Sequence, residues 1–181
     1  PHPAPIDDGF AVYQAMARPG PLCAVGESAG GNLVLSVLAR ARAAGVAPPC
    51  AVALLSPWCD LTSAGDSLTA NDGRDPTLTR AFVNDGAAFY AGGRDPASPE
   101  ISPVFGAFTS EFPPCIITAG TRDLLLSQSA TLAQTLRAAG APVDLRNWEG
   151  MWHVFEFYDE IPEAKQSLAQ IAEFLSPHFS I

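Results

Sequence analysis

Length, composition and charge place this chain among globular proteins. Its 181 residues correspond to one domain, and an apolar content of 48% is enough to bury a sizeable core. Nineteen acidic against ten basic residues give a net charge of −9, which repels phosphate backbones, so we expect no nucleic-acid partner. No apolar run approaches the ~20 residues that a membrane-spanning helix needs, so we expect no membrane insertion.

The start of the chain and its cysteines limit other assignments. The sequence begins at Pro1 without a signal-peptide pattern, so the cytoplasm is the expected compartment, although the original N-terminus is left open. Cys23, Cys50, Cys59 and Cys115 form no Cys-x-x-Cys pair of the kind that binds zinc. Three of them lie inside apolar runs, so we expect small buried thiols and no metal site.

The first fifty-five residues alternate between helical and strand patterns. Helical spacing of apolar residues predicts a helix over 6–18, with Gly20 as its stop. A short apolar run over 22–25 predicts a strand buried on both faces. An amphipathic helix then ends near Gly45, and another continuous apolar strand covers 50–55. This βαβ pattern predicts a parallel sheet.

Residues 58–112 interrupt the alternation. They are rich in Asp, Gly, Pro, Ser and Thr, with one helical pattern around Phe82, Phe89 and Tyr90. A segment this long without regular structure is either functional or disordered. The alternation then resumes as strand, helix, strand and helix over 115–119, 127–139, 143–148 and 162–175. We therefore expect a single α/β domain over 1–181 with a long excursion.

A candidate nucleophile lies where the first strand turns into a helix. Gly26-Glu27-Ser28-Ala29-Gly30 matches Gly-x-Ser-x-Gly, and this position is the context that a nucleophile elbow requires. We expect the two glycines to relieve crowding in the turn, and the Ala29 N–H at the helix start to stabilise an oxyanion. The alternative is a turn that only packs strand against helix or cradles a phosphate, which Glu27 would repel.

His153 is the candidate general base. A serine hydroxyl needs a neighbour to remove its proton, and histidine titrates near neutrality. His2 and His178 lie at the chain ends, whereas His153 follows the last expected strand and so lies at the same sheet edge as Ser28. The alternative is a surface-loop histidine.

Asp123 is the candidate partner of that histidine. It follows the 115–119 strand directly, again at the carboxyl edge of the sheet, and a carboxylate there would orient the imidazole. The alternative role is an N-cap for the next helix. The order Ser28, Asp123, His153 is the one found in α/β-hydrolases.

At these residues the sequence resembles the hormone-sensitive-lipase-like branch of the α/β-hydrolases. The resemblance covers nearly the whole chain and rests on six segments. They are His2-Pro3-x-Pro5 with Asp7-Asp8, Gly26 to Asn32, Ser56 to Thr62, Ser102-Pro103-Val104, Gly120-x-x-Asp123-x-Leu125 and Gly150 to Phe155. It implies an α/β-hydrolase fold, a mostly parallel sheet with flanking helices, and hydrolysis of short to medium acyl esters by Ser28, Asp123 and His153. It also implies that no cofactor is needed and that residues 58–112 form part of a cap over the site.

Two departures from the family pattern have physical consequences. Members often carry a second Asp where this chain has Ser127, and they carry a His-Gly-Gly-Gly loop before the elbow that this chain lacks. The early strands and N-terminal cap helices of the family also have no counterpart. We therefore expect a C-terminal portion of a longer protein, with a bare edge on the 22–25 strand. Loss of one oxyanion donor costs ~10²–10³ in rate, so the chain alone would be a feeble enzyme.

The expected function is that of a serine carboxylesterase acting on a small-molecule ester. The alternatives are a non-catalytic small-molecule receptor on a hydrolase scaffold, against which the presence of His153 argues, and an inactive fragment. Leu124, Trp152 and Val154 flank the acid and the base, so they either line the substrate pocket or belong to the core. The strand over 143–148 is an expected open edge, and the resemblance suggests that it pairs with a second copy in a homodimer.

Overall fold

The elements of the computed structural model follow the expected alternation closely. It describes residues 1–17 and 21–179, so residue 18 and Gly20, the expected end and stop of the first helix, lie outside the described residues. The strands are β1 (Cys23–Glu27), β2 (Ala51–Leu55), β3 (Cys115–Gly120) and β4 (Val143–Trp148). The α-helices are α1 (Ala4–Met16), α2 (Ala29–Ala43), α3 (Ser67–Ala70), α4 (Arg80–Ala91), α5 (Leu126–Ala138) and α6 (Pro162–Leu175), and the 3₁₀ helices are η1 (Pro103–Phe105), η2 (Phe155–Phe157) and η3 (Ser176–Phe179).

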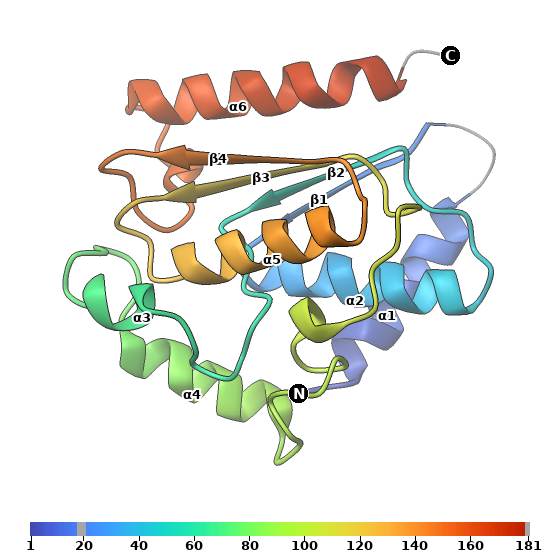
Figure 1. Cartoon of the computed structure of the whole chain (residues 1–181), viewed down its shortest axis with the longest axis horizontal. Helices are drawn as coiled ribbons and strands as arrows, with labels where there is room; N and C mark the ends of the chain where they lie inside the picture. Colours follow the sequence, from blue (N-terminus) through green and yellow to red (C-terminus); the bar gives the residue numbers. More distant parts are fainter. Residues whose placement is uncertain (18–20, 180–181) are drawn as a thin grey trace.

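The four strands form one parallel sheet in chain order, β1-β2-β3-β4. Val25 pairs with Ala53, and Ile117 pairs with both Leu54 and Leu145. All four carboxyl ends therefore lie at one edge of the sheet, the left-hand edge in Figure 1. Loops from this edge start close together, which is where ligands bind in open α/β sheets.

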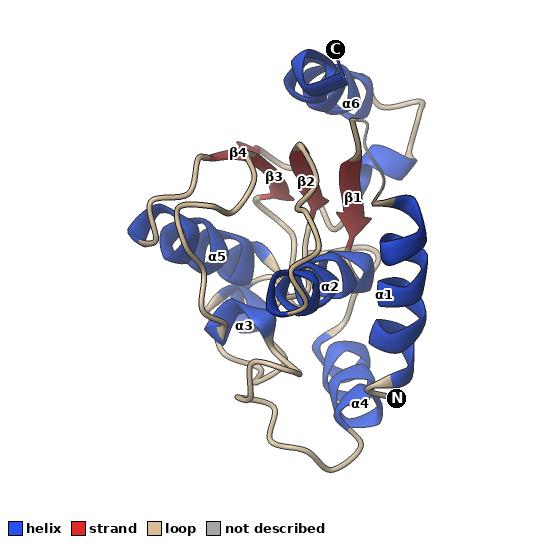
Figure 2. Cartoon of the chain, turned by 90° about the vertical axis from the view of Figure 1, so that its right-hand side faces the viewer, coloured by secondary structure: helices blue, strands red, loops and turns tan. Residues whose placement is uncertain are grey.

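Helices cover both faces of the sheet, as Figures 1 and 2 show, with α6 on one face and α2 and α5 on the other. The α2 and α5 side buries the larger apolar cluster, which includes Leu35, Leu54, Ile117 and Leu136. The α6 side buries a smaller cluster, in which Ile171 packs with alternate residues of β2 and with Ile116 of β3. β2 is buried along its whole length. Burial on both faces is therefore the physical cause of its continuous apolar run, as the sequence predicted.

The α3 region of the 58–112 segment packs against the carboxyl edge of the sheet. Asn71 Nδ2 donates to the carbonyl oxygens of Thr121 and Asp123, at 3.1 and 2.9 Å. Ser67 and Ser127 exchange two hydrogen bonds between side-chain hydroxyls and backbone N–H groups, which ties α3 to the start of α5. The helix α3 was not predicted, because four residues are too few for a hydrophobic period. Ser127 thus supports the excursion where the family often has Asp.

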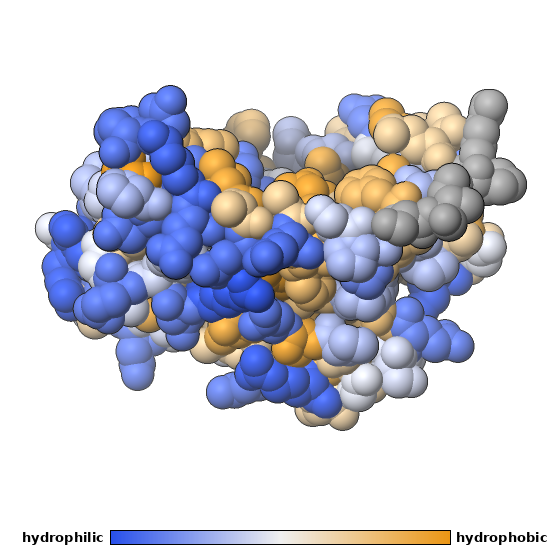
Figure 3. All heavy atoms as spheres, turned by 90° about the horizontal axis from the view of Figure 1, so that it is seen from above, coloured by the Kyte–Doolittle hydropathy of each residue, from blue (hydrophilic) through white to orange (hydrophobic). Residues whose placement is uncertain are grey.

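β1 is an outer strand of the sheet and is only partly buried. Within the described residues it pairs only with β2, so the expected bare edge is confirmed. Its Val25 is 58% exposed, so the expectation that this strand is buried on both faces is wrong, because no further strand of the described residues covers its outer side. Figure 3 views the molecule from the α6 side, where hydrophilic residues gather toward the left of the view and apolar residues show between them.

Among the described helices, none has the length and apolar composition needed to cross a bilayer.

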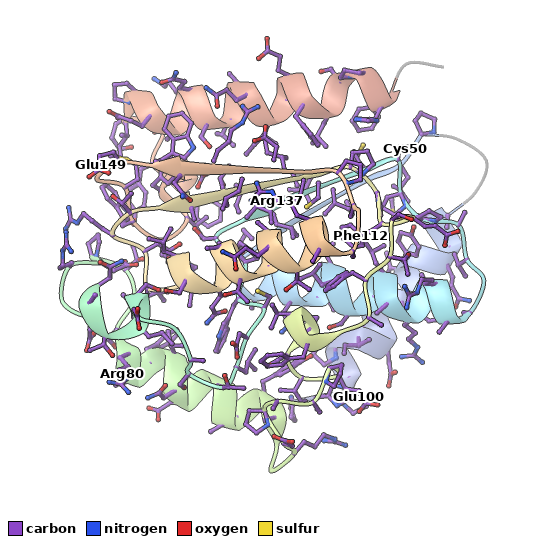
Figure 4. All side chains as sticks on the ribbon, viewed as in Figure 1. Cys50, Arg80, Glu100, Phe112, Arg137 and Glu149 are labelled. Carbon is purple, nitrogen blue, oxygen red and sulfur yellow. The ribbon has the colours of Figure 1, made fainter. Side chains whose placement is uncertain are left out.

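The cysteines correct one expectation. Cys59 and Cys115 are buried and Cys23 is half-buried, but Cys50 is exposed. Cys50 precedes β2 at the amino edge of the sheet, opposite the end marked by Glu149 in Figure 4, so it is outside the layer that buries β2. Burial raises the pKa of the Cys59 and Cys115 thiols, which keeps both protonated and unreactive.

Candidate active site

Ser28 occupies a strained turn between β1 and α2. Its φ of 48° lies in the left-handed region, which a serine rarely adopts. Hydrogen bonds hold this conformation: the Ser28 N–H donates to Leu55 O at 2.9 Å, and Ser28 O accepts from Gly31 N and Trp58 N at 3.0 and 2.9 Å. Because the turn is fastened to β2 and to the segment after it, the strain persists in the folded protein.

Two glycines are required for the turn, and of the two that were expected only Gly26 is one of them. A Cβ on Gly26 would lie 2.5 Å from the backbone oxygen of Gly30, and one on Gly31 would lie 2.7 Å from the Pro57 side chain. A Cβ on Gly30 would meet nothing within 4 Å, so the expectation that Gly30 relieves crowding is wrong. Gly30 faces open space, whereas Gly31 lets α2 approach Pro57.

The structure brings the three predicted side chains into one hydrogen-bonded relay. Ser28 Oγ lies 2.9 Å from His153 Nε2, and His153 Nδ1 lies 3.1 Å from Asp123 Oδ1. His153 is buried and Asp123 has no exposed surface, so little water competes for these contacts. Asp123 Oδ1 also accepts the Leu125 N–H at 2.8 Å, but the N-cap of α5 is Leu125 and no side chain caps this helix, so the alternative role of Asp123 as a helix N-cap is wrong.

A cavity of about 330 Å³ adjoins the elbow. Ala29, the exposed first residue of α2, lines it together with Gly30, and the N–H groups of a helix start point away from the helix and favour negative charge. Glu27 ends β1 on the other side of Ser28 and is half-buried. The remaining walls are Pro5, Asn32, Leu33, Trp58, Leu61 and Tyr90.

The residues predicted to line the pocket lie elsewhere. Leu124 is completely buried in an apolar cluster with Leu68 and Val83, and Val154 is also buried. Trp152 is half-buried, and its ring lies 5.3 Å from that of Tyr158 in an edge contact. None of the three lines the cavity beside the elbow, because its walls come from α1, α2 and the 58–112 excursion rather than from the loops of the acid and base.

Asp75 is a buried residue of the site that sequence reasoning missed. Its Oδ2 accepts the backbone N–H groups of Leu124 and His153, each at 3.3 Å, so one carboxylate joins the loop of the acid to the loop of the base. Its Oδ1 accepts the Thr77 N–H at 2.8 Å. The Asp75-Pro76-Thr77 sequence signals only a local turn, so nothing in it indicated the long-range contacts.

The loop that carries His153 is held by two further contacts. The Val154 N–H donates to Ser56 Oγ at 3.1 Å, and both residues have a φ of 47°. A Cβ on Gly120, at the end of β3, would collide with the Met151 backbone, so this glycine allows the loop to approach β3. Backbone geometry around His153 is therefore fixed from three sides, by Asp75, Ser56 and Gly120.

Comparison with known proteins assigns the family. The family model for the alpha/beta hydrolase fold matches residues 1–157. The chain belongs to the α/β-hydrolase fold family. A parallel sheet whose loops bring Ser28, Asp123 and His153 together at its carboxyl edge agrees with that assignment.

Individual relatives of this α/β-hydrolase are esterases and acetyl-hydrolases by name. It is 33% identical over 180 residues to an acetyl-hydrolase of Streptomyces hygroscopicus, covering 97% of this chain and 60% of that protein. An esterase of Acinetobacter venetianus is likewise 33% identical, with 96% and 59% covered. The crystal structure of an esterase from the bacterial hormone-sensitive lipase family superposes with a TM-score of 0.94 at 36% identity, covering 99% of this chain and 62% of that one.

The resemblance to hormone-sensitive-lipase-like esterases is thereby confirmed. The chain spans about three fifths of the length of the curated relatives that it matches.

Proposed function

We propose that this chain carries the catalytic centre of a serine carboxylesterase. The observation that supports this most is the relay from Ser28 Oγ through the His153 imidazole to Asp123, with contacts of 2.9 and 3.1 Å. A serine held at a strained turn before a helix, with a buried imidazole on its hydroxyl, is an activated nucleophile.

The mechanism follows from this geometry. His153 Nε2 removes the hydroxyl proton while Ser28 Oγ attacks the ester carbonyl, and the tetrahedral oxyanion faces the Ala29 N–H at the start of α2. The imidazolium, stabilised by Asp123, then donates the proton to the departing alkoxide, leaving an acyl group on Ser28. Water, deprotonated by His153, attacks this acyl-enzyme and releases the carboxylic acid.

The proposed substrates are esters with short to medium acyl chains. The cavity of about 330 Å³ beside Ala29 and Gly30 has walls that are almost entirely apolar, including Leu33, Leu61 and Trp58. An apolar cavity at the small end of the usual range for ligand sites suits a short alkyl group. The acetyl-hydrolase name of one relative is compatible with this size.

Hydrolysis of p-nitrophenyl butyrate by the wild type and Ser28→Ala tests the proposal. The expected result is a loss of about 10⁴–10⁶-fold in kcat, because a triad acts as a unit and fails without its nucleophile. Covalent labelling by a fluorophosphonate, read by intact mass, should occur in the wild type and not in Ser28→Ala. Equal rates in both proteins would falsify the esterase proposal for this chain and favour a binding role or an inactive fragment.

A further inference from the structure

Glu156 is a buried carboxyl group that the proposed mechanism does not use. It lies in η2, three residues after His153, and only 4% of its surface is exposed. Its Oε2 is buried and makes no hydrogen bond within the described part of the chain. A glutamate is almost never buried unless it is paired, so the burial of Glu156 close in sequence to His153 needs a physical reason.

One oxygen of Glu156 joins three parts of the fold. Oε1 accepts the hydroxyl hydrogen of Thr118 in β3 at 2.7 Å and that of Ser167 in α6 at 2.9 Å. Thr118 lies on the strand that leads into Asp123, and Glu156 lies on the segment that carries His153. The carboxyl group therefore fastens the loop of the base to the strand of the acid and to the covering helix.

The surroundings favour the neutral form of this carboxyl group. Burial raises the pKa of Glu156, and the nearby Asp123 charge raises it further, while the hydrogen bonds from Thr118 and Ser167 oppose the shift. β3 and α6 face it with these two hydroxyls, and its own segment carries the buried His153 and the exposed Asp159 and Glu160. No basic partner compensates an ionised Oε2 within the described residues.

We propose that Glu156 is a positioning residue for His153, whose uncharged carboxyl group holds the base in the relay and whose ionisation loosens that hold. The proposal rests on the proposed function, because the position of His153 matters for the contact of its Nε2 with the Ser28 nucleophile. Ionisation places a charge, shared by both oxygens, on a buried carboxylate whose Oε2 accepts no hydrogen bond within the described residues, so it lowers the stability of the anchored segment although Oε1 keeps its two hydroxyl donors.

The sign of the pH effect follows from the two states of Glu156. In the unfolded chain its carboxyl group titrates near the ordinary value of 4.5, whereas its pKa in the folded protein is higher. Between these values the folded state binds more protons, so stability falls as pH rises through that range and the loss is complete above the folded pKa. Glu156→Gln has no proton to lose, so it keeps its anchor at every pH.

Three variants of the full chain test the proposal. Glu156→Gln retains an oxygen acceptor for Thr118 and Ser167, Glu156→Ala removes it, and Glu160→Gln removes an exposed carboxylate four residues away as a matched control. The measurements are kcat and KM for p-nitrophenyl butyrate against pH, the unfolding temperature against pH, and the His153 ring signals by NMR. The last two do not depend on esterase activity, and the chain has only three histidines to assign.

We expect Glu156→Ala to lower kcat about 10-fold with little change in KM, the size of effect of one buried hydrogen-bonding group, and Glu156→Gln to restore it at pH 6. As pH rises, kcat and the unfolding temperature should fall less in Glu156→Gln than in the wild type. The His153 ring signals of Glu156→Gln should also lack the pH-dependent change that ionisation of Glu156 causes in the wild type. Glu160→Gln should follow the wild type throughout.

Two results would overturn the proposal. Identical pH profiles and His153 signals for the wild type and Glu156→Gln would show that ionisation of Glu156 does not reach the base. A change in unfolding temperature alone would make Glu156 a structural residue only. An active Ser28→Ala would defeat the esterase proposal instead, and the NMR and unfolding data would still decide the role of Glu156.

Discussion

The interior of the sheet and its carboxyl edge are built on opposite principles. In the interior, Leu54 and Ile117 have no exposed surface and pack among other apolar side chains. At the carboxyl edge, Ser28, Ser56 and Val154 hold positive φ angles although none is a glycine. Buried polar groups also gather at that edge, and they are Asp75, Asp123, His153 and Glu156.

The residues of the interior therefore stabilise the fold, whereas those of the carboxyl edge form the chemical site. Apolar burial stabilises the fold without directional requirements, whereas strain and buried charge destabilise it and persist only where surrounding contacts impose them. We therefore expect interior substitutions to change stability and leave the rate per folded molecule unaltered. Substitutions at the carboxyl edge should lower the rate per folded molecule, whether or not they also change stability.

The largest change in stability is expected for Ile117→Ala. Removing a completely buried side chain from the main cluster should cost about 2–5 kcal/mol of unfolding free energy, measured by urea denaturation. Activity per folded molecule should stay within about twofold, because Ile117 does not touch the relay. If the alanine variant does not fold, Ile117→Val replaces it in the same two measurements, with an expected cost of about 0.5–1.5 kcal/mol.

Asp75→Asn should reduce the rate more than the stability. The amide keeps the shape but loses the charge that receives the Leu124 and His153 N–H groups, so both loops become less well placed. We expect a loss of about 10-fold in kcat, on the scale of one charge-assisted hydrogen bond. The matched control is Asp95→Asn, an exposed aspartate whose side chain accepts, among the residues described, only the Ala97 N–H in a similar turn. Equal effects of the two substitutions would contradict the role of Asp75.

The two outer glycines of the elbow should respond differently to alanine. Gly26→Ala places a Cβ against the Gly30 backbone and should cost about 1–3 kcal/mol of stability by overpacking, besides moving Ser28. Gly30→Ala has open space and should fold as stably as the wild type, with an effect confined to KM because Gly30 lines the cavity. Thermal unfolding with kinetics distinguishes them, and equal losses of stability would contradict the steric argument.

The smallest effect is expected on the outer strand β4. Arg146→Ala removes a partly exposed ion pair with Asp144 and should change stability by less than about 1 kcal/mol, since solvent screens such pairs. A larger loss in urea denaturation would mean that the Arg146 contact with Gln170 of α6 matters more than its exposure suggests.

The same strand carries our proposal of a homodimer. β4 forms one side of the four-stranded sheet, and pairing with a second copy would cover its free hydrogen-bonding groups. Sedimentation over a range of concentrations should then show a dimer, whereas a monomer at every concentration would contradict the proposal.

Local patterns were sufficient for most of the fold. The apolar runs of β2 and β3, and the apolar period of α2 and α5, predicted elements within about two residues of those observed, because burial on a sheet face imposes those patterns. They did not predict α3, whose stability comes from contact with α5 rather than from its own four residues.

By itself the sequence determined that Ser28, Asp123 and His153 would lie at one edge, because each follows a strand of a parallel sheet. Tertiary structure alone decided the rest of the site: that Asp75 joins the two loops, that Glu156 ties the segment of the base to β3 and α6, and that Gly31 rather than Gly30 must lack a side chain. The physical reason is the separation along the sequence of the residues that must interact. The positions of the strands and their parallel direction follow from local hydrophobic patterns, whereas a carboxylate finds partners up to 78 residues away only when packed backbones bring the groups within hydrogen-bond distance.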